Sequence, residues 1–121
     1  MSKIQLKRIY DDPSVDDGFR MLVDRFWPRG IKKSDAKLDE WNKEIAPTIA
    51  LRKWFDHDET KWPKFIQLYE AELLQNVVEL HRLRAIAEQQ TLTLLFAAKN
   101  VEMNQAQVIL TVLNQKNGTI K

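Results

Sequence analysis

The sequence predicts an α/β fold, a small layered single domain with about three strands, mostly parallel or mixed, flanked by four to five helices. Three segments of strand length are separated by stretches in which apolar residues recur with the period of a helix. The chain of 121 residues is long enough to bury a core, and it has no cysteine for disulfides or thiolate sites. We expect one domain over residues 1–114 and a frayed tail over residues 115–121.

The three predicted strands differ in exposure. Residues 3–9 alternate between polar and apolar side chains, as a half-exposed edge strand does. Residues 19–26 form the second strand, and residues 91–98 are nearly all apolar, which indicates a central strand covered on both faces. We expect the second and third strands to be parallel neighbours. The direction of the first strand stays open, because residues 10–18 are fewer than the roughly dozen residues that a parallel crossover needs, and local rules favour a hairpin.

Helical periodicity fills most of the remaining chain. The predicted helices span residues 38–45, 51–55, 62–73, 76–87 and 100–113. Pro47 separates the first two, and Pro63 is tolerated in the first turn of the third, where its missing N–H is not needed. Asn76 and Glu79 resemble a capping box at the start of the fourth helix, and Asn100 is the expected N-cap of the last. The last helix should be substantially buried.

Composition and charge exclude several functional classes. Nineteen basic and seventeen acidic residues leave a formal net charge of +2, too balanced to indicate a nucleic-acid protein by itself. The longest apolar run, residues 94–98, is far below the ~20 residues of a membrane span, and the N-terminus has no apolar signal core. Three glycines leave no Gly-rich phosphate or dinucleotide loop. We therefore expect a cytoplasmic protein with no membrane partner, no cofactor and no metal.

The best candidate site lies at the end of the second strand, in residues 22–30. An apolar strand ends there in two arginines and a Pro/Gly turn, and the planar donor fork of arginine suits a carboxylate or a phosphate. If residues 91–98 form a parallel neighbour, its carboxyl end brings further polar side chains and the first amides of the last helix to the same edge. We expect an anion-binding cleft for a phosphorylated or carboxylated small molecule, built by Arg25, Arg29, Lys99 and Asn100.

A structural reading of the arginines stays open beside this cleft. In that reading a nearby carboxylate neutralises them and locks the loop, and the carboxylates available are Asp11, Asp12, Asp24 and Glu44. Asp24 is also a candidate catalytic group. So is His57, whose imidazole suits proton transfer and which lies between two aspartates. The second of these, Asp58, equally fits an N-cap, and a lone histidine lacks the further ligands of a zinc site. Whether the chain is an enzyme stays open, and any catalysis would be metal-free acid–base chemistry.

Four tryptophans interleave with basic residues, as in proteins that bind single-stranded nucleic acid. The basic residues are Lys32, Lys33, Lys37, Arg52 and Lys53. Trp41, Trp54 and Trp62 also lie on apolar helical stripes, which favours packing in the core. A non-enzymatic module that binds nucleic acid or a protein, with a regulatory role, is therefore the alternative function, and nucleic acid is less favoured than a small anion.

Several short motifs follow one another along the chain: Lys7-Arg8-Ile9-Tyr10, Asp17-Gly18-Phe19-Arg20, the run over 22–30, Leu51-Arg52-Lys53-Trp54-Phe55, His57-Asp58 and Ala97-Ala98-Lys99. In this order they resemble the YeaO-like family, a bacterial branch of the domain of unknown function 488, over residues 3–114. The resemblance implies a compact α/β cytoplasmic protein with no established activity, and it supports the pairing of the second and third strands. It also implies that the first strand is parallel to the second.

The resemblance also draws attention to the triplet that opens the last helix. It implies that distant relatives carry a Cys-His-Arg-like triplet there and that close relatives usually read Asn-His-Ala. This chain has Asn104-Gln105-Ala106. Cysteine chemistry is therefore excluded, and Gln105 replaces an imidazole at the middle position.

Overall fold

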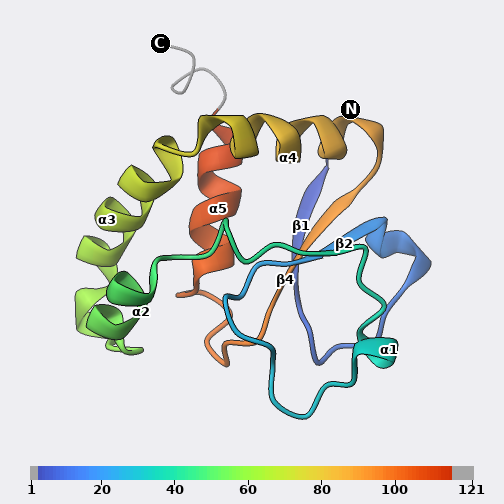
Figure 1. Cartoon of the computed structure of the whole chain (residues 1–121), viewed down its shortest axis with the longest axis horizontal. Coiled ribbons are helices and arrows are strands. Elements are labelled where there is room, and N and C mark those ends of the chain that lie inside the picture. The colour runs from blue at the N-terminus through green and yellow to red at the C-terminus, as the bar shows by residue number, and fades with distance from the viewer. Residues whose placement is uncertain (1–2, 116–121) are drawn as a thin grey trace.

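A four-stranded parallel sheet is the centre of the fold (Figure 1). The computed structural model describes residues 3–115. The strands are β1 (Ile4–Arg8), β2 (Phe19–Leu22), β3 (Glu40–Trp41) and β4 (Leu92–Phe96), in the spatial order β1-β4-β2-β3. The predicted fold class is confirmed, with one strand more than the sequence predicts.

Five α-helices and two short 3-10 turns surround the sheet within residues 3–115. The helices are α1 (Lys33–Ala36), α2 (Ile49–Phe55), α3 (Trp62–Leu74), α4 (Val77–Gln89) and α5 (Gln105–Asn114), and the 3-10 turns are η1 (Val15–Asp17) and η2 (Glu59–Lys61). Helix α5 lies between the sheet and α3, and α4 runs across the top of the view in Figure 1. None of these helices is long and apolar enough to cross a membrane.

Strand β1 is an edge strand, as predicted, but its neighbour is β4 and not β2. It runs parallel to β4, from Ile4 opposite Leu92 to Arg8 opposite Phe96, while β2 pairs with the other side of β4. The hairpin that local rules favour is therefore wrong, because residues 9–18 connect β1 to a strand two places away. The parallel direction that the family resemblance implies is confirmed.

The helix predicted over residues 38–45 is wrong, because β3 lies in this segment. The amide of Asn42 donates to the carbonyl of Leu22 (2.8 Å), so the backbone bonds to β2 and not within a helix. Leu38 packs on one face of the sheet, whereas Ile45 belongs to the core on the other face. Leu38 and Ile45 therefore have the spacing of one helical stripe although they pack in two different cores. Helix α1, which the periodicity does not indicate, precedes this segment.

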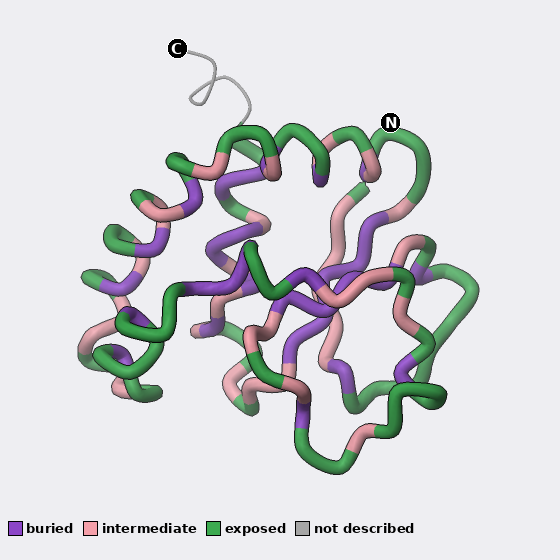
Figure 2. The backbone as a smooth tube through the Cα atoms, viewed as in Figure 1, coloured by how far each residue is buried: buried purple, intermediate pink, exposed green. Residues whose placement is uncertain are grey.

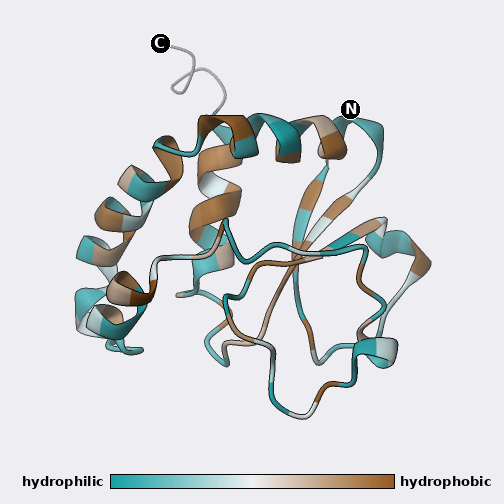
Figure 3. Cartoon of the chain, in the orientation of Figure 1, coloured by the Kyte–Doolittle hydropathy of each residue, from teal (hydrophilic) through white to brown (hydrophobic). Residues whose placement is uncertain are grey.

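The buried residues of the strands belong to two hydrophobic clusters, one on each face of the sheet. Figure 2 shows that β4 and α5 are largely buried. Leu92, Leu94 and Phe96 of β4 join the main core, which α2, α3, α4 and α5 complete. Leu95 of β4 and Leu22 of β2 point to the opposite face and join a smaller cluster. Figure 3 shows hydrophobic residues along α5 and the strands. Every residue of β4 is buried, which confirms the predicted central strand.

The smaller face also holds a buried ion pair that the sequence pattern does not predict. Arg20, which is 4% exposed, donates to Asp17 (2.5 Å) and to the carbonyl of Ala36 (2.7 Å). Lys7 contacts the same carboxylate at 3.0 Å. Burial would raise the pKa of Asp17, but hydrogen bonds from the Ser14 amide, Lys7 and Arg20 outweigh burial and lower it. The cluster ties η1 and α1 to the sheet.

The tryptophans are less buried than predicted. Trp41 and Trp62 are half-buried, and Trp54 is 39% exposed, so the core assignment of Trp54 is wrong. Trp62 stacks on Phe65, with ring centroids 5.5 Å apart. Trp54 lies on the outer side of α2, where the Lys61 ammonium covers its ring at 5.1 Å from the centroid. A short helix can bury only one side, and α2 buries Leu51 and Phe55 instead.

Two predictions about helix ends have different outcomes. Asn76 is the N-cap of α4, but its side chain makes no capping hydrogen bond, and Glu79 accepts from Arg82 instead (2.7 Å). The capping box is therefore wrong. The predicted tail, residues 115–121, lies outside the described residues except for Gln115.

Candidate functional site

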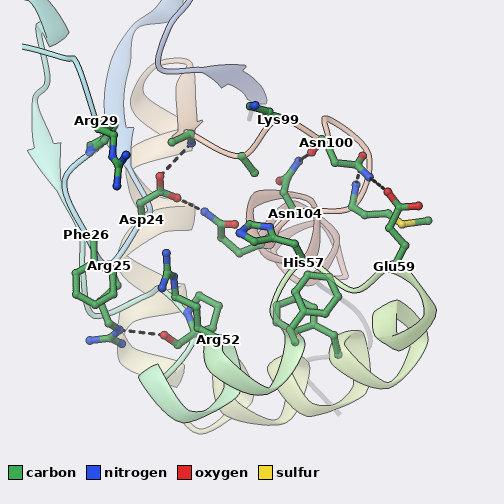
Figure 4. Close-up of a pocket in the computed structure, with 18 of the residues that line it drawn as sticks. Asp24, Arg25, Phe26, Arg29, Arg52, His57, Glu59, Lys99, Asn100 and Asn104 are labelled. Carbon is green, nitrogen blue, oxygen red and sulfur yellow. Dashed lines mark hydrogen bonds between the residues drawn. The ribbon is translucent and has the colours of Figure 1, made fainter.

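A pocket of about 750 Å³ opens at the carboxyl ends of β2 and β4 (Figure 4). It is lined by the loop after β2, by the loop between β4 and α5, and by residues of α2 and the turn that follows it. Because β2 and β4 are parallel neighbours, both strand-end loops leave the same edge of the sheet. The site residues predicted from the sequence all line this pocket: Asp24, Arg25, Arg29, His57, Lys99 and Asn100.

Asp24 is the half-buried acidic group of the pocket. Its Oδ2 accepts a hydrogen bond from the Ala97 amide (3.0 Å), and its Oδ1 accepts one from the side-chain amide of Gln105. The Trp41 indole donates to the backbone carbonyl of Asp24 (2.7 Å). Burial raises the pKa of Asp24 to about 6, although the hydrogen bonds from Ala97 and Gln105 and the positive charge of Arg52 act in the opposite direction. This carboxyl group therefore changes between its protonated and ionised forms near pH 6.

Arg25 holds two loops together. Its Nε donates to the carbonyl of Pro47 (3.0 Å), and its Nη2 donates to the carbonyl of Ala46 (3.2 Å). Both of these residues are buried, so the bonds fix the loop after β2 to the segment that leads into α2. Arg25 therefore locks the loop, as the structural reading expects, but its partners are carbonyl oxygens and not carboxylates.

Arg29, Arg52 and Lys99 bring positive charge to the pocket without a carboxylate partner. None of them lies within ion-pair distance of an acidic side chain in the described part of the chain. Arg29 and Lys99 are exposed, and the guanidinium group of Arg52 lies 4.8 Å from the centroid of the Phe26 ring. Their positive charges are therefore not neutralised by any acidic side chain of the described residues.

Asn100 organises the loop between β4 and α5 and does not cap α5. Its Oδ1 accepts from the Met103 amide (3.0 Å), and its Nδ2 donates to Glu59 (3.1 Å). The N-cap of α5 is Asn104, whose Oδ1 accepts from the Gln107 amide (3.2 Å) and whose Nδ2 donates to the carbonyl of Asn100 (2.9 Å). The predicted cap is therefore wrong, because a loop of several residues precedes the helix.

His57 lies at the exposed rim of the pocket. Asp56 and His57 both have a positive φ, 45° and 56°, which non-glycine residues seldom adopt. Asp58 accepts a hydrogen bond from the Thr60 amide (3.0 Å) at the start of η2, which confirms the capping interpretation. Within residues 3–115 no hydrogen bond joins His57 to Asp24, so the two candidate catalytic groups do not form a pair.

Apolar side chains complete the wall of the pocket. Phe55 and Phe65 stack with ring centroids 4.4 Å apart, and Met103, Pro28 and Pro47 also line the pocket. Such a combination of apolar walls and a few polar groups is typical of sites for small organic molecules. Over the described range no cluster of three or more His, Cys, Asp or Glu side chains is arranged to hold a metal ion.

Arg52 and Gln105 are pocket residues that the sequence reasoning does not assign to the cleft. Arg52 belongs to α2, and only the packing of this helix brings it to the sheet edge. Gln105 begins α5 and reaches back to the carboxylate of Asp24. The only sequence signal for Gln105 is its place in the triplet over 104–106.

Comparison with known proteins gives matches over most of the chain. A family described as the inactive DUF488-N3 subclade matches residues 3–119. The chain is 52% identical over 106 residues to the uncharacterised protein YeaO of Escherichia coli (strain K12), which covers 88% of this chain and 92% of that protein. It is 34% identical over 113 residues to uncharacterised proteins of Mycobacterium bovis and Mycobacterium tuberculosis, covering 93% of this chain and 95% of each relative. No solved structure matches the chain.

Proposed function

This chain is YeaO-like and belongs to the family described as the inactive DUF488-N3 subclade, and from that premise we propose that it binds a small phosphorylated or carboxylated molecule without converting it. The word inactive in the family description supports binding without turnover. The chain also lacks a cysteine nucleophile, and its two candidate acid–base groups, Asp24 and His57, are not hydrogen-bonded to each other in the described structure.

One observation carries the proposal: the cations Arg29, Arg52 and Lys99 line a single pocket, and no acidic side chain of the described chain pairs with them. A concave site concentrates the potential of like charges, which favours an anion inside it. Arginine forks also match carboxylate and phosphate oxygens in geometry. A small organic anion therefore satisfies both the charges and the apolar wall.

The aromatic surfaces favour a small molecule over a strand of nucleic acid. A stacked base needs a free aromatic face. Lysine ammonium groups of the chain itself lie over the rings of three tryptophans, at 5.8 Å from the centroid for Trp27, 4.4 Å for Trp41 and 5.1 Å for Trp54. The indole N–H groups of Trp27 and Trp41 donate to backbone carbonyls, at 2.7 Å in each case.

Calorimetric titration tests the proposal. The probes are inorganic phosphate, phenyl phosphate and succinate, applied to the wild-type chain and to Arg29→Gln and Lys99→Gln. Each substitution should weaken binding several-fold because it removes one charge from the pocket. The matched control is Lys64→Gln, an exposed lysine on α3 that does not line the pocket, and it should bind like the wild type.

A parallel titration with a single-stranded oligonucleotide tests the alternative. Contacts with several phosphates make affinity fall steeply with salt, whereas one small anion gives a shallow dependence. Oligonucleotide binding that is steep in salt and lost in Lys32→Gln or Lys33→Gln, together with no response to the small anions, would contradict the proposed function.

A further inference from the structure

We propose that the ligand of this pocket is bipolar, with an acidic group for the cations Arg29, Arg52 and Lys99 and an ammonium group that pairs with the carboxylate of Asp24. The inference rests on the proposed function and adds the chemistry of the second end of the ligand. Its starting point is Asp24, an acidic side chain that lines the pocket together with these cations and forms an ion pair with none of them.

The contacts of Asp24 are neutral. Its two carboxylate oxygens accept from the Ala97 backbone amide (3.0 Å) and from the side-chain amide of Gln105, and no cation of residues 3–115 lies within 4.0 Å of it. Each carboxylate oxygen can accept two hydrogen bonds, so each retains one acceptor position. A carboxylate that has lost part of its contact with water is stabilised by a charged partner. Here the partner is missing, and the group lines an open pocket.

The cations around Asp24 are held elsewhere. Arg25, on the same loop, is bonded to the carbonyls of Ala46 and Pro47. Arg52, from α2, acts on the carboxylate only at a distance, and its guanidinium group lies over Phe26. The groups that donate hydrogen bonds to the carboxylate of Asp24 are uncharged: the side-chain amide of Gln105 on α5 and the Ala97 amide after β4. The phenol of Tyr69 on α3, which interacts electrostatically with Asp24, donates to the carbonyl of Ile45 at 2.5 Å. The rim residues His57, Glu59 and Lys99 also share the pocket.

The titration behaviour of Asp24 agrees with this geometry. Burial is the main cause that raises its pKa to about 6, because two neutral hydrogen bonds and a distant guanidinium group do not compensate for lost hydration. An ammonium group in contact with the carboxylate would supply that compensation and would favour the ionised form. Binding of such a ligand should therefore weaken as the pH falls below about 6.

The pocket also offers apolar surface for a hydrocarbon part of the ligand. Phe55, Phe65 and Met103 line the pocket beside Asp24 and the cations. We therefore assign the ligand to molecules in which a short hydrocarbon chain separates an acid from an amine, such as amino acids and aminoalkyl phosphates. The acid end comes from either a carboxylate or a phosphate, and matched probes separate these two sources.

The experiment compares ligands that differ only in the amine. The phosphate pair is n-propyl phosphate and 3-aminopropyl phosphate, and the carboxylate pair is propionate and β-alanine, each titrated calorimetrically at pH 7.5 and pH 5. With the wild type at pH 7.5, the amine-bearing member of at least one pair should bind about tenfold tighter, as expected for one charge-assisted hydrogen bond. The preference should shrink at pH 5, and Asp24→Asn should abolish it. Asp35→Asn, an exposed aspartate on α1, is the matched control and should keep the preference.

The outcomes separate the two proposals. Equal affinity within both pairs, or a preference that survives in Asp24→Asn, overturns the bipolar ligand but leaves the anion site intact. Failure of every probe to bind overturns the anion site and the bipolar ligand together. The wild-type comparison decides the matter even if Asp24→Asn does not fold.

Discussion

The side-chain amide of Gln105 donates a hydrogen bond to the carboxylate of Asp24 and so joins the first residue of α5 to the loop after β2. The family resemblance puts a histidine at the position of Gln105 in close relatives. A glutamine amide keeps a donor for the carboxylate but cannot carry a proton between ligand and protein. In this chain the position therefore supplies a hydrogen-bond donor to Asp24 and no acid–base group.

Asp24→Asn should change how stability depends on pH. Burial raises the pKa of Asp24 from 3.8 to about 6, so the folded chain keeps a proton that the unfolded chain releases between these values. The contribution of Asp24 to stability is therefore fully present below pH 4 and is lost as the pH rises through about 6. The loss corresponds to roughly 3 kcal/mol at most. Asparagine does not titrate. Between pH 4 and pH 7 the free energy of unfolding of the variant, measured with urea, should therefore rise relative to that of the wild type by up to this amount.

The control for this measurement is Asp35→Asn on the exposed surface of α1, whose stability should run parallel to that of the wild type at every pH. If the free energies of unfolding of Asp24→Asn and the wild type differ by the same amount from pH 4 to pH 7, the raised pKa of Asp24 is contradicted.

Gln105→Ala should destabilise the chain mainly at neutral pH. The substitution leaves the ionised carboxylate of Asp24 with the Ala97 amide as its remaining hydrogen-bond donor, which costs about 1–2 kcal/mol. At pH 4.5 the carboxyl group is mostly protonated, so the cost should be smaller. Gln107→Ala is the matched control on the same helix, because its side chain donates to the carbonyl of Val101 (3.1 Å), which does not titrate. Unfolding curves with the same loss at both pH values for Gln105→Ala would argue against this coupling.

Arg25 and Arg29 should respond differently to substitution although they share one loop. Arg25→Met leaves the buried carbonyls of Ala46 and Pro47 without their donor and should cost about 1–3 kcal/mol of unfolding free energy. Arg29→Gln changes an exposed side chain and should stay within about 0.5 kcal/mol of the wild type. Chemical denaturation of the two variants measures the difference directly. The reverse order would show that Arg29 is the structural arginine.

Trp41 and Trp54 should differ in the same way. Trp41 packs edge-to-face on Trp27, with ring centroids 5.2 Å apart, and its indole donates to the carbonyl of Asp24, so Trp41→Ala should cost about 3 kcal/mol or more. Trp54 is 39% exposed, and Trp54→Ala should cost about 1 kcal/mol or less. Denaturant unfolding compares them. Similar large losses for both would contradict the exposure of Trp54.

Local periodicity was sufficient to predict most of the elements. The alternation in residues 3–9 and the nearly all-apolar pattern over 91–98 depend only on which side chains face a covered surface, and both segments contain strands. The stripes of α3 and α4 are equally local. Strand β3 was not predicted, because its two residues are defined only by their pairing with β2. The apolar residues around it have helical spacing but belong to two different cores.

For the pocket, the sequence by itself predicted that Asp24, Arg29 and Lys99 lie near one edge if their two strands are parallel neighbours. The structure pairs these strands in that way. Only the tertiary structure decided what each side chain contacts. It brought Arg52 and Gln105 to the same pocket from two helices, and it bound Arg25 to carbonyl oxygens while it left Arg29 without an ion pair in the described chain. The physical reason is that the spacing of apolar residues within one element shows which of its sides is buried. The partner of a charged side chain instead depends on elements that pack against it from distant parts of the sequence.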